Sequence, residues 1–198
     1  MPIWKRPQRR ARSASRRRAA GFTLTELMVV VVITGVLASL GFAALNQHVS
    51  AAWGAEALNM VQSIRAAQER WRAEHMMYFD VSAGATNWYP KDPTVPFNRE
   101  QQNPFFYDPT SGAHADNNRW LLLRPTVTGP VRFGYMVNAG VAGQAMTVPA
   151  AGPAVNWPTP VDNWYVIQAI GDTDWDGTFS YYRASSLDGE IYTTRHGE

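Results

Sequence analysis

"GFTLTELMVVVVITGVLASL", residues 21–40, lies near the N-terminus of this 198-residue chain. A run of 19 residues without a charged side chain, Leu27 to Leu45, begins within this stretch. As a helix this run spans roughly 28 Å, about the hydrocarbon thickness of a bilayer. A single carboxylate, Glu26, stands immediately before the run. The stretch therefore predicts a long helix that crosses a membrane and carries one acidic residue at its entrance.

The charges are divided unevenly about this stretch. Eight of the 18 basic residues and none of the 16 acidic ones precede Phe22, which leaves ten basic and 16 acidic side chains, a formal charge of −6, in the remainder. The basic head places the N-terminus of a membrane helix in the cytoplasm. An acidic remainder argues against binding to nucleic acid, which needs clustered Lys and Arg. The eight basic residues are Lys5, Arg6, Arg9, Arg10, Arg12, Arg16, Arg17 and Arg18.

Three interpretations of the apolar run remain open at this point. It is a single-pass anchor, or a secretory signal cleaved within "LGFAAL", or the helix of a polymerising subunit. The run is longer than the roughly 7–15 apolar residues of an ordinary signal peptide. A carboxylate near the membrane entrance is costly unless it has a partner. In a polymer, Glu26 can pair with the N-terminal ammonium of a neighbouring copy, which cleavage between Gly21 and Phe22 would create.

The segment "G-F-T-L-T-E-L-M-V-V-V-V-I-T-G-V-L-A" resembles the N-terminal motif of type IV pilins and of the related pseudopilins of type II secretion. The resemblance implies that a prepilin peptidase cuts after Gly21 and methylates Phe22, and that Glu26 is needed for assembly and methylation. It also implies partners: other pilin subunits, inner-membrane assembly machinery and membrane lipid. Thr25 departs from the pattern, because an aliphatic residue is usual there, and Ala43 stands where many pilins have proline.

The periodicity of the next segment extends the helix into the head of the protein. Leu58, Val61, Ile64, Ala67 and Trp71 recur at spacings of three and four, which predicts one apolar stripe for core packing. With the resemblance, the chain divides into four parts. They are a cleaved leader at 1–21, a transmembrane and polymerisation half-helix at 22–45, an amphipathic half-helix at 46–78, and a globular head at 79–198.

Strand patterns occupy the last third of the chain. Segments rich in aromatic and β-branched residues lie at 131–137, 163–171, 177–185 and 189–194. Asp-Gly pairs precede the last two segments, which favours an antiparallel meander. Residues 80–128 predict loops around a short helix or strand at 119–123, and residues 138–162 predict an exposed loop. The fold class is α+β, a long helix packed on a four-stranded antiparallel sheet, as in pilins.

"GDTDWDGTFS" contains the one metal-like motif. Asp172, Asp174 and Asp176, followed by Gly177, match the first half of a calcium loop. Arg183 occupies the position of the bidentate glutamate, which excludes a complete EF-hand. We expect either a polar hairpin turn or a truncated calcium site, completed by carbonyls and by Asp188 or Glu190.

No pattern of catalytic residues is found. The four histidines lack metal-ligand spacing, and the chain has no phosphate-binding glycine loop. Two interpretations apply to four aromatic residues: a sugar-binding surface, or ordinary packing in the core and loops. The residues are Trp88, Tyr89, Trp157 and Trp164.

The sequence thus predicts a non-enzymatic structural subunit, a pilin or minor pilin, that polymerises for adhesion or motility. Before assembly we expect it in the inner membrane with its head in the periplasm, and afterwards in a surface pilus or a periplasmic pseudopilus. A type II secretion pseudopilin and a singly anchored periplasmic binding or adhesion protein are the alternatives.

Overall fold

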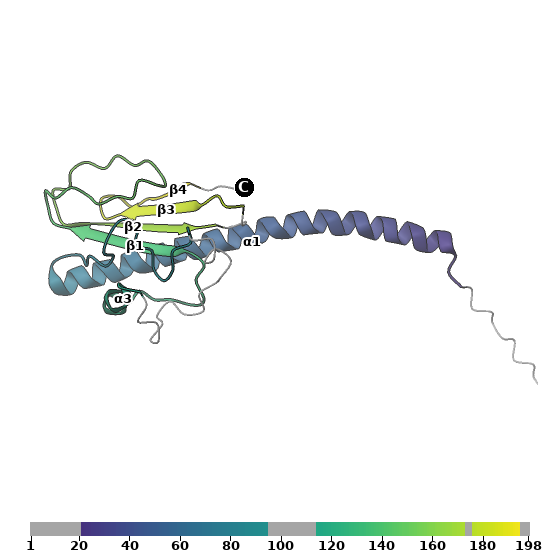
Figure 1. The fold of residues 1–198 in the computed structure, drawn as a ribbon, viewed down its shortest axis with the longest axis horizontal. Helices are drawn as coiled ribbons and strands as arrows, with labels where there is room; N and C mark the ends of the chain where they lie inside the picture. The colour runs from purple at the N-terminus through teal and green to yellow at the C-terminus, as the bar shows by residue number, and fades with distance from the viewer. Residues whose placement is uncertain (1–20, 95–113, 173–175, 195–198) are drawn as a thin grey trace, which may run out of the picture. The chain divides into compact units, whose positions relative to one another are not determined.

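The computed structural model describes residues 21–94, 114–172 and 176–194. The chain divides into two compact units, Met1–Phe42 and Ala43–Glu198. Figure 1 shows the elements, which are α1 (Leu24–His75), α3 (Asn117–Leu123), β1 (Gly134–Gly140), β2 (Trp164–Gly171), β3 (Ser180–Ser185) and β4 (Ile191–Thr194). The described residues confirm the predicted α+β class: an N-terminal apolar helix and a four-stranded antiparallel sheet.

α1 begins and ends where its sequence favours a helix terminus. Its first turn carries Glu26 and its last turn Arg72 and His75, which places charges favourably toward the helix dipole. Met76 has a φ of 61°, and its backbone N–H donates to the carbonyl of Arg72 at 2.8 Å. A left-handed residue of this kind stops a helix and satisfies a terminal carbonyl. The helix therefore ends at His75, slightly earlier than the apolar pattern predicts.

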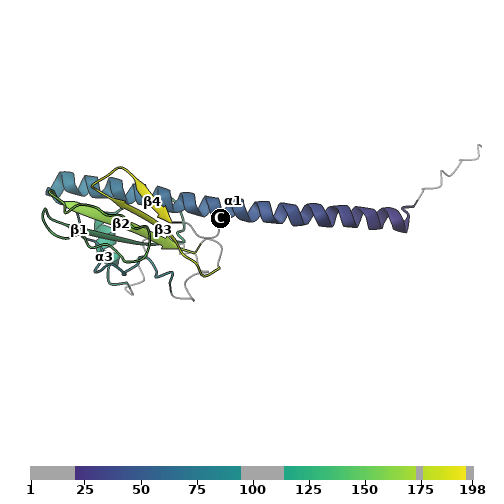
Figure 2. The same cartoon turned by 90° about the horizontal axis from the view of Figure 1, so that it is seen from above.

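The sheet is a meander in which each strand pairs with the next, so its order is β1-β2-β3-β4 (Figure 2). The four predicted strands are all present. The first lies about three residues later than predicted, because Asn138, Ala139 and Gly140 continue the pairing with β2. Val131 and Phe133, predicted to begin that strand, instead lie before β1 and are buried in the core. The segment at 119–123, left open between helix and strand, forms most of α3.

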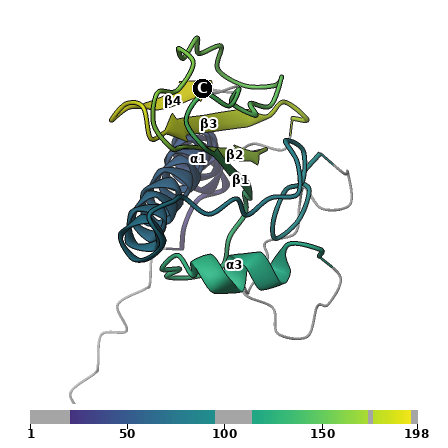
Figure 3. The same cartoon turned by 90° about the vertical axis from the view of Figure 1, so that its left-hand side faces the viewer.

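Both helical elements of the second unit lie on one face of the sheet, where the main core forms (Figure 3). Val61, Ile64 and Ala67 of α1 are buried there, and Leu58 and Trp71 pack against them. This confirms the predicted stripe. Trp120 and Leu123 of α3 are fully buried in the same core.

The opposite face of the sheet is also covered, because all eight residues of β2 are buried. Arg183 of β3 is only 3% exposed, and it donates to the side chain of Gln168 and to three backbone carbonyls. Those carbonyls belong to Pro149, Ala151 and Pro153, within the loop predicted to be exposed. Most residues of this loop are exposed or half-buried, as predicted, but these three carbonyls are bonded to the sheet. A buried guanidinium needs acceptors, and this one obtains them by anchoring the loop to the sheet.

Candidate processing and assembly site

The start of α1 is closed by a reciprocal pair of side chains, Thr23 and Glu26. The backbone N–H and the hydroxyl of Thr23 donate to Glu26 Oε2 at 2.9 and 2.8 Å. The backbone N–H of Glu26 donates in return to Thr23 Oγ1 at 3.2 Å. This is a capping box, with Thr23 as N-cap and Glu26 as the third helical residue. It satisfies two backbone donors that a helix terminus otherwise leaves unpaired.

The capping box gives Glu26 partners within its own chain. A carboxylate in the first turn of a helix is stabilised by the helix dipole, and here it also has donors in its own chain. Reasoning from the charge of Glu26 alone predicts only an intermolecular partner and misses Thr23. The signal was visible, since Thr-x-x-Glu before an apolar run is the sequence signature of this cap. Glu26 therefore has a local role, and its presence does not by itself separate an anchor from a polymerising subunit.

Gly21 and Phe22 precede the helix in an accessible, non-helical segment. A Cβ atom added to Gly21 would meet nothing within 4 Å, and Phe22 is 83% exposed. The peptide bond between them can therefore be reached by a peptidase without unwinding α1. The structure thus keeps the predicted cleavage site, Gly21 and Phe22, next to the predicted assembly residue, Glu26.

The first part of α1 presents apolar side chains on every side. Leu24–Phe42 forms a candidate membrane span of 19 residues with mean hydropathy 2.1, none of it buried within the chain. A helix that is apolar all round requires lipid or other helices around it. The large exposed side chains of the span are Leu24, Leu27, Met28, Val29, Val30, Val31, Val32, Ile33, Val36, Leu37, Leu40 and Phe42.

The few polar side chains of this span are satisfied within the helix. Thr34 Oγ1 donates to the carbonyl of Val30 at 2.8 Å, and Ser39 Oγ donates to that of Val36 at 2.8 Å. Thr25, the departure from the pilin pattern, shares a 3.1 Å hydrogen bond with the hydroxyl of Thr23. Because unpaired polar groups are costly in hydrocarbon, this arrangement suits an apolar surrounding.

The predicted calcium loop stays a prediction. Asp174 lies outside the described residues. Asp172 accepts the backbone N–H of Gly177 at 3.0 Å, and Asp176 accepts that of Thr178 at 2.6 Å. Within the described part of the chain, no group of three metal-binding side chains is found. A shift of the melting temperature in millimolar calcium would test the site.

Asp188 and Glu190 cannot complete such a site as expected. They lie in the turn between β3 and β4, whereas Asp172 and Asp176 lie between β2 and β3, at the other end of β3. A strand of this length separates its ends by roughly 15–20 Å. The carboxylate of Asp188 instead accepts the indole N–H of Trp157 at 2.8 Å and the hydroxyl of Tyr192 at 3.0 Å.

The aromatic residues considered as a sugar-binding surface belong mostly to the core. Trp88, Tyr89 and Trp164 are each at most 5% exposed. Tyr89 stacks on Trp120, and its hydroxyl donates to Asn117 at 2.7 Å. Ordinary packing thus accounts for three of the four, and Trp157 is engaged by Asp188.

Residues 16–42 match the family model described as the prokaryotic N-terminal methylation motif. This motif is characteristic of type IV pilins and prepilin-like proteins. The match covers the basic block at 16–18, Gly21, Phe22, the capping box and the whole candidate membrane span. No curated protein and no solved structure matches the chain.

Proposed function

We propose that this chain is a subunit of a type IV filament, a pilin or minor pilin that assembles through α1 to support adhesion or motility. The observation that carries the proposal is the position of the methylation motif. It places an accessible Gly21–Phe22 peptide directly before a capped helix whose apolar surface is exposed all round. Association of such helices gives each of them an apolar partner in place of lipid.

Processing prepares the subunit for this step. The arginine-rich leader keeps the N-terminus in the cytoplasm, a prepilin peptidase cleaves after Gly21, and Phe22 becomes an N-methylated terminus. The subunit then waits in the inner membrane with its head in the periplasm. Removal of the leader also leaves an acidic mature chain, which is in keeping with a structural subunit that binds no nucleic acid.

Assembly exchanges the partner of Glu26. In the free subunit its carboxylate accepts two hydrogen bonds from Thr23. In the filament it neutralises the terminal amine of a neighbouring copy. An ion pair in a low-dielectric helix bundle is stronger than one in water, and a neutral–ionic hydrogen bond is weaker than one between two ions. The exchange therefore favours the polymer once a neighbour with a free amine is present.

Two variants of Glu26 separate its local role from its intermolecular one. Glu26→Gln keeps an acceptor for the capping box but loses the charge, whereas Glu26→Val loses both. We expect both variants to insert into the membrane and to be missing from sheared filaments, measured by immunoblot of membrane and filament fractions. If Glu26→Gln assembles as well as the unaltered chain, the charge pair is not the assembly interaction.

The mass of the mature N-terminus tests the class of protein. We expect a chain that begins with N-methylated Phe22. A chain that keeps its arginine-rich head indicates a singly anchored periplasmic binding or adhesion protein instead. A processed chain found only in a periplasmic polymer that supports secretion indicates a type II secretion pseudopilin.

A further inference from the structure

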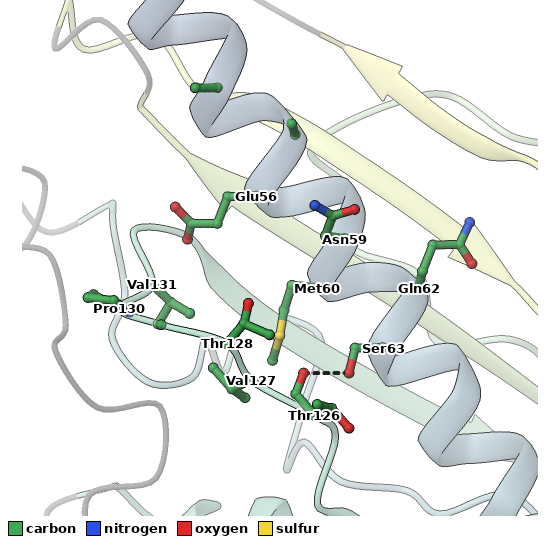
Figure 4. Close-up of a pocket in the computed structure, with 13 residues that line it drawn as sticks. Glu56, Asn59, Met60, Gln62, Ser63, Thr126, Val127, Thr128, Pro130 and Val131 are labelled. Atoms are coloured by element: carbon green, nitrogen blue, oxygen red, sulfur yellow. Dashed lines mark hydrogen bonds between the residues drawn. The ribbon is translucent and has the colours of Figure 1, made fainter.

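A groove runs along α1 on the side of the segment that follows α3 (Figure 4). Its volume is about 680 Å³, and it is lined by α1 residues between Ala52 and Ser63 and by residues 126–131. The hydroxyl of Ser63 donates to the carbonyl of Thr126 at 2.6 Å and fastens the two walls together. Half-buried Val127 contributes apolar surface to the groove, and Met60, only 5% exposed, lies beneath it. The groove is therefore fixed and wide enough for several side chains.

Glu56 supplies the charge in this groove. Its carboxylate accepts the backbone N–H of Arg132 at 2.8 Å. The guanidinium of Arg132 stacks on the ring of Trp53 at 4.2 Å from its centroid, and its charge also acts favourably on the Glu56 anion. Burial raises the pKa of Glu56 above its ordinary value, since the anion is partly removed from water. Arg132 is the nearby cation, but within the described part of the chain no side-chain cation forms a direct ion pair with Glu56, so a second cation can pair with it.

The outer face of α3 has the opposite character. Trp120 and Leu123 anchor this short helix in the core, while Leu121 is 43% exposed and Leu122 61% exposed. Arg119 is exposed beside them, and none of the described residues pairs with its guanidinium. Arg119 and Leu122 are three residues apart, so they lie on one face of the helix. The face offers one cation beside exposed leucine.

We propose that the outer face of α3 in one copy of this chain docks into the Glu56 groove of the next copy, so that Arg119 pairs with Glu56 and Leu122 contacts Val127. The inference rests on the proposed polymerisation and extends it from the N-terminal helix to the head. Charge complementarity selects the second copy: the groove presents an anion above apolar surface, and α3 presents a cation beside apolar side chains.

The two surfaces differ, so the contact is heterologous and can repeat along a filament without closing. The C-terminal end of α3 lies beside Arg70, which donates to the carbonyl of Leu123 at 2.6 Å. The groove lies at residues 52–63 of the same helix. For copies with parallel α1 helices, docking therefore corresponds to an axial offset of roughly 10–20 Å at 1.5 Å per residue.

Cysteine cross-linking tests the contact directly, because the chain contains no cysteine. Asn59→Cys, at the groove, and Leu122→Cys, on α3, are made in separate full-length chains and expressed together. We expect oxidation of sheared filaments to give a dimer only when both variants are present. Asn59→Cys with Val161→Cys is the matched control, since Val161 is 86% exposed and lies on neither surface.

Charge reversal tests the ion pair in the same assay. Arg119→Glu should lower the yield of the Asn59–Leu122 dimer by about fivefold or more, as expected for a partly desolvated interfacial pair. Arg124→Glu makes the same change at an exposed arginine just beyond α3 and should leave the yield unchanged. Glu56→Lys combined with Arg119→Glu should restore it.

Each outcome decides something different. Filaments with N-methylated Phe22 that give no Asn59–Leu122 dimer overturn the docking contact but leave the proposed function intact. Equal dimer yields for the control pair overturn it too. If the unaltered chain forms no polymer, both the proposed function and this contact are wrong.

Discussion

In the single chain, Thr23 holds the carboxylate that the proposed assembly assigns to a neighbouring copy. The same carboxylate oxygen accepts both hydrogen bonds from Thr23 in the single chain. These bonds involve exposed groups, so each contributes only modestly to stability. A partner of that strength fixes the side chain before assembly and can still be displaced by a terminal amine. Thr23 is therefore best described as a positioning residue for Glu26.

Removing the hydroxyl of Thr23 tests this description. Thr23→Val keeps the shape of the side chain but deletes the cap, which should weaken the helix start by about 1 kcal/mol. Amide exchange at Thr25, Glu26 and Leu27 in the detergent-solubilised chain should then accelerate about fivefold. Thr23→Ser keeps the hydroxyl and should exchange like the unaltered chain. Equal exchange in all three would mean that the cap is not formed.

Element boundaries were the part of the fold that sequence patterns predicted least well. Periodicity predicts α1, its buried stripe and all four strands, because apolar side chains must repeat at the spacing of the element that buries them. The amino-acid composition of the loop at 138–162 does not show that the loop is anchored to the sheet. Its three acceptors are backbone carbonyls, which any residue type provides. The donor, Arg183, lies about 30 residues away in the sequence, and a single arginine in a strand gives no sign of such a role.

Arg183 is expected to be the main anchor of that loop. Arg183→Met removes four hydrogen-bond connections and should lower the free energy of unfolding by about 2–4 kcal/mol. The freed loop should also be cut by proteases between residues 145 and 160 before the head unfolds. Arg119→Met, at an exposed arginine, serves as the control in both thermal melting and limited proteolysis. An uncut loop in the Arg183 variant would show that other contacts hold it.

Glu56 should make the stability of the head depend on pH. A carboxyl group whose pKa is raised by folding contributes fully below its ordinary value of 4.5, and that contribution is lost as the pH rises through the raised pKa. Glu56→Gln has no charge to desolvate, so it should melt at a higher temperature than the unaltered chain at pH 7. The difference should disappear near pH 4. A variant that is less stable at pH 7 would show that the charge is stabilised within the chain.

At the scale of the whole molecule, sequence and structure differ in what they reveal about function. The motif at residues 16–42 is local, so it can be recognised from the sequence alone, and the cleavage site and the polymerisation role of the helix stay predictions. The groove is assembled from two segments of the chain that lie more than 60 residues apart in the sequence. Arg119 and Glu56 carry no signature in the sequence, because a docking surface is defined by which side chains folding leaves exposed. The head contact could therefore be inferred only from the folded chain.

The division into two units predicts that the head folds without the membrane helix. The second unit, Ala43–Glu198, contains the core, the sheet and the anchored loop. A chain shortened to residues 43–198 should be soluble and unfold cooperatively, with a melting temperature within a few degrees of that of the full chain in detergent. It should also be monomeric at micromolar concentration, because one α3–groove contact is too small for stable association. Analytical ultracentrifugation and thermal melting measure both properties. A shortened chain that aggregates or melts without cooperativity would show that the first half of α1 is part of the folding unit.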